Sequence, residues 1–125
     1  MAIKFLISVT ALFIALKASA GDYEDGVSAI TRKDYTTALS KFLVAAEQGL
    51  ANAQYNLGLM YERGEGVAQD YKEAMRWYRV AARQGFAQAQ NNLGLMYANG
   101  RGVEQDYNEA ARWYRLAAQQ GEADA

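Results

Sequence analysis

The chain has 125 residues, of which 51% are apolar and 12% aromatic, so the length predicts at most one domain and the composition supports a packed core. It contains no cysteine, histidine or proline, which excludes disulfides, Cys/His zinc sites and nucleophiles activated by histidine. The formal net charge of -1 gives no indication of nucleic-acid binding.

The first twenty residues have the pattern of a secretory signal peptide. Lys4 supplies a positive charge, residues 5–16 form an apolar run of twelve, and Ala18-Ser19-Ala20 is a small-x-small cleavage site. An uncleaved N-terminal anchor is the alternative, although twelve apolar residues fall short of the roughly 20 that span a bilayer. We therefore expect residues 1–20 to be removed on export, leaving a mature chain without a membrane span in the periplasm or outside the cell.

A first pair of short helices is expected in residues 21–49. Residues 22–32 carry apolar side chains three and four positions apart, as one face of a helix does. A second stretch with the same spacing starts at Tyr35, directly after Asp34, and ends at Gly49. Aspartate is a favoured N-cap and glycine a favoured helix stop, so both ends of this second helix are marked.

Two copies of a 36-residue unit follow this pair. Residues 49–84 and 85–120 are identical at 25 of 36 aligned positions, and AQYNLGLMY in one copy corresponds to AQNNLGLMY in the other. Such self-similarity indicates stacked supersecondary units, none of which buries its apolar face alone. We assign residues 50–85 and 86–121 to two repeats, and residues 122–125 to the stub of a further unit.

Each repeat has the same predicted plan of helix, glycine loop and helix. Residues 50–63 and 86–99 form the first helices, Gly-x-Gly-Val loops follow, and Asp70 and Asp106 cap second helices that end at Gln84 and Gln120. The first unit fits this plan if Gly26 aligns with Gly58 across a loop four residues shorter.

Glycine inside a helix costs about 0.5–1 kcal/mol relative to alanine. Gly58 and Gly94 both lie in the predicted first helices. We therefore predict that a ring of the partner helix, Tyr78 or Trp77, packs over the missing side chain of Gly58.

The two copies resemble Sel-like repeats, relatives of the tetratricopeptide repeat with the consensus A-x-A-x-x-x-L-G-x-x-Y, G-x-G-V and D-x-x-x-A-x-x-W-Y-x-x-A-A-x-x-G. The matching residues of the first copy, each with its counterpart in the second, are Ala51, Ala53, Leu57, Gly58, Tyr61, Gly64, Gly66, Val67, Asp70, Ala74, Trp77, Tyr78, Ala81, Ala82 and Gly85. The resemblance implies an all-α fold, a right-handed α-solenoid of antiparallel helix pairs that binds proteins or peptides and needs no cofactor. Residues 21–49 are more like an ordinary tetratricopeptide repeat, since Lys41 replaces the tryptophan.

Positions at which the copies differ suggest a partner-binding surface. In related solenoids the first helix of each pair lines the concave side, and several differences fall on these helices. The candidate residues are Gln54, Tyr55, Glu62, Gln90, Asn91 and Ala98. Neutral variation at exposed positions is the alternative interpretation.

Other residues have competing interpretations. Trp77 and Trp113, together with Tyr78 and Tyr114, form either an aromatic ligand box or part of the core. A basic stripe on one helix, made of Lys72, Arg76, Arg79 and Arg83, either attracts an acidic partner or is a solvated face with Glu73–Arg76 and Glu109–Arg112 ion pairs.

Catalysis is the rival class of function. Some exported relatives are proposed to bind or hydrolyse β-lactams, but these resemble cysteine-rich members, and this chain contains neither cysteine nor a Ser-x-x-Lys motif. We therefore expect a non-enzymatic adaptor, with a cell-envelope hydrolase or β-lactam-binding protein as the alternative. A solenoid needs polar ends, so self-association through the C-terminal end is a further expectation.

Overall fold

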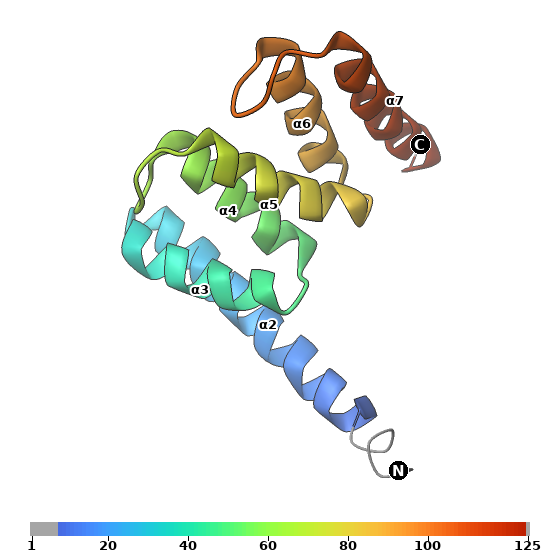
Figure 1. Cartoon of the computed structure of the whole chain (residues 1–125). Coiled ribbons are helices and arrows are strands. Elements are labelled where there is room, and N and C mark those ends of the chain that lie inside the picture. The colour runs from blue at the N-terminus through green and yellow to red at the C-terminus, as the bar shows by residue number, and fades with distance from the viewer. Residues whose placement is uncertain (1–7, 125) are drawn as a thin grey trace, which may run out of the picture.

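The computed structural model describes residues 8–124, and the side chains of residues 20–121. Within these residues the chain forms six helices and no strand: α2 (Ser8–Thr31), α3 (Tyr35–Glu47), α4 (Ala51–Arg63), α5 (Tyr71–Arg83), α6 (Ala87–Asn99) and α7 (Tyr107–Asp124). Figure 1 shows them stacked as three antiparallel pairs, α2/α3, α4/α5 and α6/α7, in chain order. The prediction of an all-α solenoid is confirmed.

The helix ends follow the predicted signals. A carboxylate oxygen of Asp70 accepts hydrogen bonds from the backbone N–H groups of Lys72 and Glu73 at 3.0 and 3.2 Å, and Asp34 and Asp106 cap α3 and α7 in the same way. These bonds satisfy N–H groups that have no partner inside the helix. Each second helix therefore starts at the same place in its unit.

A glycine of the first helix packs against an aromatic ring of the second helix in every pair. The contacts are Gly26 with Phe42, Gly58 with Tyr78, and Gly94 with Tyr114. A Cβ atom at Gly26 or Gly94 would lie 2.6 or 2.7 Å from its ring, and one at Gly58 would overlap Tyr78. The predicted close approach is confirmed, with Tyr78 rather than Trp77 as the partner, and so is the alignment of Gly26 with Gly58.

The structure corrects the expected bounds of the two outer helices. α2 begins at Ser8 and continues without a break through Gly21, where the helix was expected to start only at Asp22. α7 continues through Gly121 to Asp124 instead of ending at Gln120. Gly85 ends its helix with φ of +89° because the chain turns back there into α6. At Gly121 the described chain remains helical, so the same sequence signal is not followed by a turn there.

Part of the expected terminal segments lies outside the described residues. Residues 1–7 of the expected signal peptide and Ala125 of the expected stub are not described. The N-terminal half of α2 projects from the stack beyond α3, as Figure 1 shows. The packed body of the protein is therefore formed by the second half of α2 and the five helices that follow.

Candidate partner-binding surface

The six candidate residues lie on the first helices of the two repeats. Gln54, Tyr55 and Glu62 belong to α4, and their counterparts Gln90, Asn91 and Ala98 belong to α6. The two glutamines are buried, with 2% and 3% of their surface exposed. Tyr55, Glu62 and Ala98 are half-buried and Asn91 is exposed. These last four are accessible to a partner, whereas the two glutamines present almost no surface to one.

The buried glutamines connect neighbouring units. The Nε2 group of Gln54 donates to the carbonyl oxygen of Ala46 at 3.1 Å, and its Oε1 accepts from Nε2 of Gln84 at 2.8 Å. In the next unit, the Nε2 group of Gln90 donates to the carbonyl oxygen of Ala82, also at 3.1 Å. The buried Oε1 of Gln90 has no hydrogen-bond partner among the described residues. A buried amide that spans two units favours one register of stacking, because any other register leaves polar groups unpaired.

Tyr55 packs against Tyr78 of its own unit and against Phe86 at the start of the following unit. Its ring centroid lies 5.8 Å from that of Tyr78 and 5.3 Å from that of Phe86. Its counterpart Asn91 has no following unit to contact within the described residues and is exposed. The change from tyrosine to asparagine between the copies therefore correlates with packing between units, a relation that the sequence alone does not reveal.

Glu62 is held by a side chain of the second helix. The hydroxyl of Tyr78 donates to Oε2 of Glu62 at 2.7 Å, and the Glu62 carbonyl accepts from Nε2 of Gln69 at 2.8 Å. Burial, more than the bond to Glu62, raises the pKa of Tyr78, so this hydroxyl remains a donor well above neutral pH. The carboxylate of Glu62 is thus oriented, and its Oε1 forms no bond or ion pair with the side chains of residues 20–121.

The tryptophans belong to the core. Trp77 and Trp113 are 7% and 8% exposed and lie in the two clusters of buried apolar side chains. Although the Nε1 group of Trp113 is buried without a partner, neither ring faces an open site. The core interpretation is confirmed for both tryptophans and for Tyr78, which is fully buried, whereas Tyr114 is 38% exposed.

The basic stripe is partly neutralised by the chain itself. Arg76 pairs with Glu73 at 3.1 Å and lies over the Trp77 ring at 4.6 Å, while Nη2 of Arg79 donates to the hydroxyl of Tyr97 at 3.0 Å. The Glu109–Arg112 pair is also present, at 3.2 Å. The solvated face with ion pairs is confirmed.

Residues 8–124 contain neither a metal-ion site nor a membrane-spanning helix. No group of three or more acidic side chains is arranged to hold a metal ion in this part of the chain. No helix of the same segment has both the length and the apolar character needed to cross a bilayer.

Stacked helix pairs joined by short loops, with glycine against an aromatic ring in each pair, define an α-solenoid of the tetratricopeptide type. The family model of the Sel1 repeat matches residues 51–86 and 87–122, which together make up more than half of the chain. The chain therefore belongs to the Sel1 repeat family, the Sel-like family that its sequence resembles. Sel1 repeats generally mediate protein interactions.

Solved structures support this assignment. A protective antigen with an SLR fold from uropathogenic Escherichia coli is 48% identical over 82% of this chain and 23% of its own, with a TM-score of 0.80. A Sel1 repeat protein from Oxalobacter formigenes is 38% identical over 94% of this chain and 49% of its own, also with a TM-score of 0.80. This chain thus spans about a quarter and about half of these two relatives.

A more distant structure shares the fold alone. The cysteine-rich protein B of Helicobacter pylori is 22% identical over 90% of this chain and 86% of its own, with a TM-score of 0.73. No curated protein gives a significant match.

Proposed function

We propose that the protein is an exported adaptor that binds a protein or peptide through the first helices of its repeats. The accessible candidates Tyr55, Glu62, Asn91 and Ala98 form the contact surface, and the buried Gln54 and Gln90 hold the two helices in register beneath it. The partner belongs to the cell envelope or its surroundings, because residues 1–20 have the pattern of a secretory signal.

The hydrogen bond from Tyr78 to Glu62 is the observation that supports this surface most directly. The hydroxyl of Tyr78 occupies one of the Glu62 carboxylate oxygens and thereby orients the other, which has no partner in the described chain. An oriented, half-buried carboxylate forms stronger hydrogen bonds than a freely rotating one, since less side-chain entropy is lost on binding. We therefore expect the partner to place a lysine, an arginine or a backbone N–H group against Glu62.

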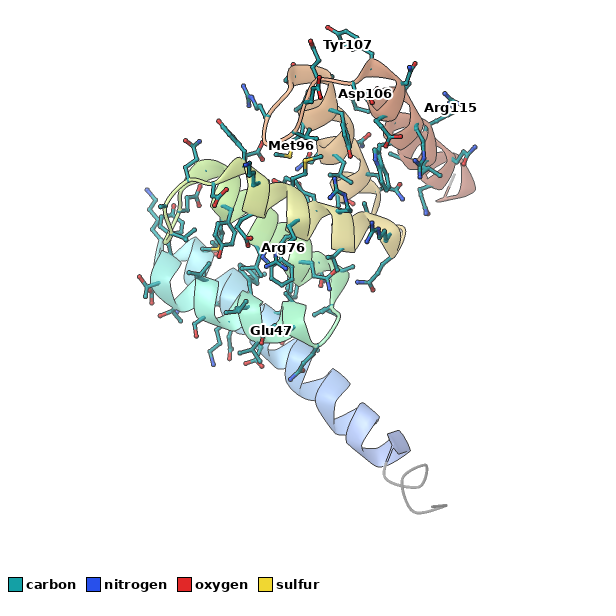
Figure 2. The ribbon with its side chains drawn as sticks, in the orientation of Figure 1. Glu47, Arg76, Met96, Asp106, Tyr107 and Arg115 are labelled. Carbon is teal, nitrogen blue, oxygen red and sulfur yellow. The ribbon has the colours of Figure 1, made fainter. Side chains whose placement is uncertain are left out.

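A crosslinked pull-down from the envelope of the host cell tests this proposal. Glu62→Gln removes the charge but keeps an oxygen for the Tyr78 hydroxyl, so the fold should survive while recovery of the partner falls about tenfold, as loss of a charged hydrogen bond predicts. Glu47→Gln, which alters an exposed acid on α3 (Figure 2), is the matched control and should have no effect. Equal recovery with both variants would contradict the proposed surface.

Two further measurements address the remaining parts of the proposal. N-terminal sequencing of the protein from its host should begin at Gly21, and a mature protein that begins at Met1 would contradict cleavage. Saturable turnover of cell-wall or β-lactam substrates by the purified chain would favour a hydrolase over an adaptor.

A further inference from the structure

An aliphatic side chain follows the packed glycine in each first helix. The three residues are Val27 after Gly26, Leu59 after Gly58 and Leu95 after Gly94. Since each glycine faces the aromatic ring of its own second helix, the next residue lies about 100° further round the helix and points away from that ring. Val27 and Leu95 are 41% and 47% exposed, and Leu59 is half-buried. We call these three side chains the aliphatic row.

The aliphatic row crosses the first helices of all three pairs. The pairs stack in chain order (Figure 1), and the contact between glycine and ring sets each first helix at the same rotation against its second helix. The row therefore runs over α2, α4 and α6 at one level. Val27 and Leu59 belong to pairs that are followed by another pair, and they remain accessible there. The row is thus a feature of the side of the stack.

A hydrogen-bond acceptor lies three positions before each member of the row. These residues are Glu24, Asn56 and Asn92, and residues three apart are neighbours on a helix surface. The Nδ2 group of Asn56 donates to the carbonyl oxygen of Asn52 at 2.8 Å, which leaves the Oδ1 of Asn56 to accept from a ligand. Each first helix therefore presents an apolar group and an acceptor side by side.

The charge beside the row is negative. Glu24 is exposed, and Glu62 has one carboxylate oxygen held by Tyr78 at 2.7 Å and the other free. Arg63 on the same helix pairs with Glu65 at 3.9 Å, and α6 contains no charged residue. By charge complementarity, a ligand of this surface is cationic as well as apolar.

We propose that the aliphatic row binds a proline-rich segment of the partner in the polyproline II conformation, with an aliphatic residue at every third position and one lysine or arginine. The inference rests on the proposed function and names the class of segment that the first helices bind. Glu62 lies on the same side of α4 as Tyr55, which contacts Phe86 of the next unit. The cation of the segment therefore falls between the residues that contact Leu59 and Leu95.

The spacing of the helices favours polyproline II over other conformations. Helices of neighbouring units lie roughly 10 Å apart, the diameter of a helix with its side chains. Three residues of polyproline II span about 9 Å and return the side chain to the same side, whereas every third residue of a β-strand points to the opposite face. Polyproline II has no internal hydrogen bonds, so its N–H groups are available to Glu24, Asn56 and Asn92. The N–H groups of a helical segment are bonded internally and would leave these acceptors unused.

Two labelled peptides of identical composition test the spacing. The probe, Leu-Pro-Pro-Leu-Pro-Lys-Leu, has leucine at every third position, and the control, Leu-Pro-Leu-Pro-Leu-Pro-Lys, has it at every second position. Fluorescence anisotropy with the full chain should show saturable binding of the probe. Its affinity should be at least tenfold higher than that of the control, because a mismatched spacing loses the contact of at least one leucine.

Variants of the protein locate the binding site. Val27→Asn and Leu95→Asn should each weaken binding of the probe about tenfold, through loss of apolar contact. Glu62→Gln should weaken it to a similar extent, through loss of a charged hydrogen bond. Leu43→Asn, at a site 39% exposed on α3, is the matched control and should leave binding unchanged. Circular dichroism of each variant confirms its fold.

Three results would each overturn the proposal: no saturable binding, equal affinity for the two peptides, or equal losses with Val27→Asn and Leu43→Asn. The pull-down separates it from the proposed function. An envelope partner whose recovery depends on Glu62 but not on Val27 would keep the Glu62 surface and exclude the aliphatic row. Sedimentation that shows a concentration-dependent mass, abolished by Val27→Asn, would replace the proposal with self-association through this row.

Discussion

The packing of glycine on tyrosine predicts that the same substitution has different effects in the two repeats. Gly58 and Gly94 occupy identical LGLMY segments, but the ring over Gly58, Tyr78, is fully buried, whereas the ring over Gly94, Tyr114, is 38% exposed. Alanine at either position gains about 0.5–1 kcal/mol of helix propensity. Whether this gain is realised depends on whether the ring is able to move.

At Gly58 the ring has no space to enter. Tyr78 is enclosed by the next unit and bonded to Glu62, so an added methyl group overpacks the core at a cost of about 1–3 kcal/mol. After subtraction of the propensity gain, Gly58→Ala should destabilise the protein by roughly 1 kcal/mol, within a range of about 0–2.5 kcal/mol. For a chain of this size a loss of about 1 kcal/mol lowers the melting temperature by roughly 3–6 °C.

Gly94→Ala is the matched control. Tyr114 is 38% exposed in the described chain and is able to shift toward solvent, so the net change should stay within about 0.5 kcal/mol. Thermal melts followed by circular dichroism measure both variants, and Tyr78→Leu combined with Gly58→Ala should be at least about 1 kcal/mol more stable than the two single changes predict by addition. Equal melting temperatures for Gly58→Ala and Gly94→Ala would refute the reasoning.

Three further predictions follow from the hydrogen bonds. The raised pKa of Tyr78 means that above about pH 10 the unfolded chain releases a proton that the folded chain keeps, so this residue should lower the free energy of unfolding by about 1.4 kcal/mol per pH unit; urea unfolding at rising pH should show a shallower decline in Tyr78→Phe, and parallel declines would contradict this. Asp70→Ala should cost about 1 kcal/mol through loss of the N-cap, and an unchanged urea midpoint would count against it. Gln54→Leu should cost more than Gln90→Leu, because only Gln54 has both amide atoms bonded; equal costs in urea unfolding would show that the second bond adds nothing.

Much of the fold was predictable because its signals are local. Asp70 and Asp106 cap their helices through local hydrogen bonds. The two copies agree at 25 of 36 aligned positions, so both repeats are expected to adopt one structure. The close approach at Gly58 was also predictable, since glycine inside a helix implies that something occupies the space of its side chain. These inferences depend on residues near one another in sequence, or on the repeat itself.

The candidate surface was predicted less well because accessibility depends on neighbours that a single unit does not contain. Gln54 and Gln90 are polar residues on the first helices, and the sequence does not show that their amides connect one unit to the preceding one. The difference between Tyr55 and Asn91 resembles a change of ligand preference, yet within the described residues Tyr55 packs against the next unit and Asn91 is exposed.

By itself, therefore, the sequence determined the helices, their caps, the repeat and the family, since each of these arises from short-range backbone preferences and from a duplicated pattern. Only the tertiary structure decided which side chains remain accessible. Tyr78 and Tyr114 have the same sequence context, but one is fully buried and the other 38% exposed. The physical reason is that burial in a solenoid is shared between adjacent units, so the exposure of a residue depends on the unit that stacks against its own.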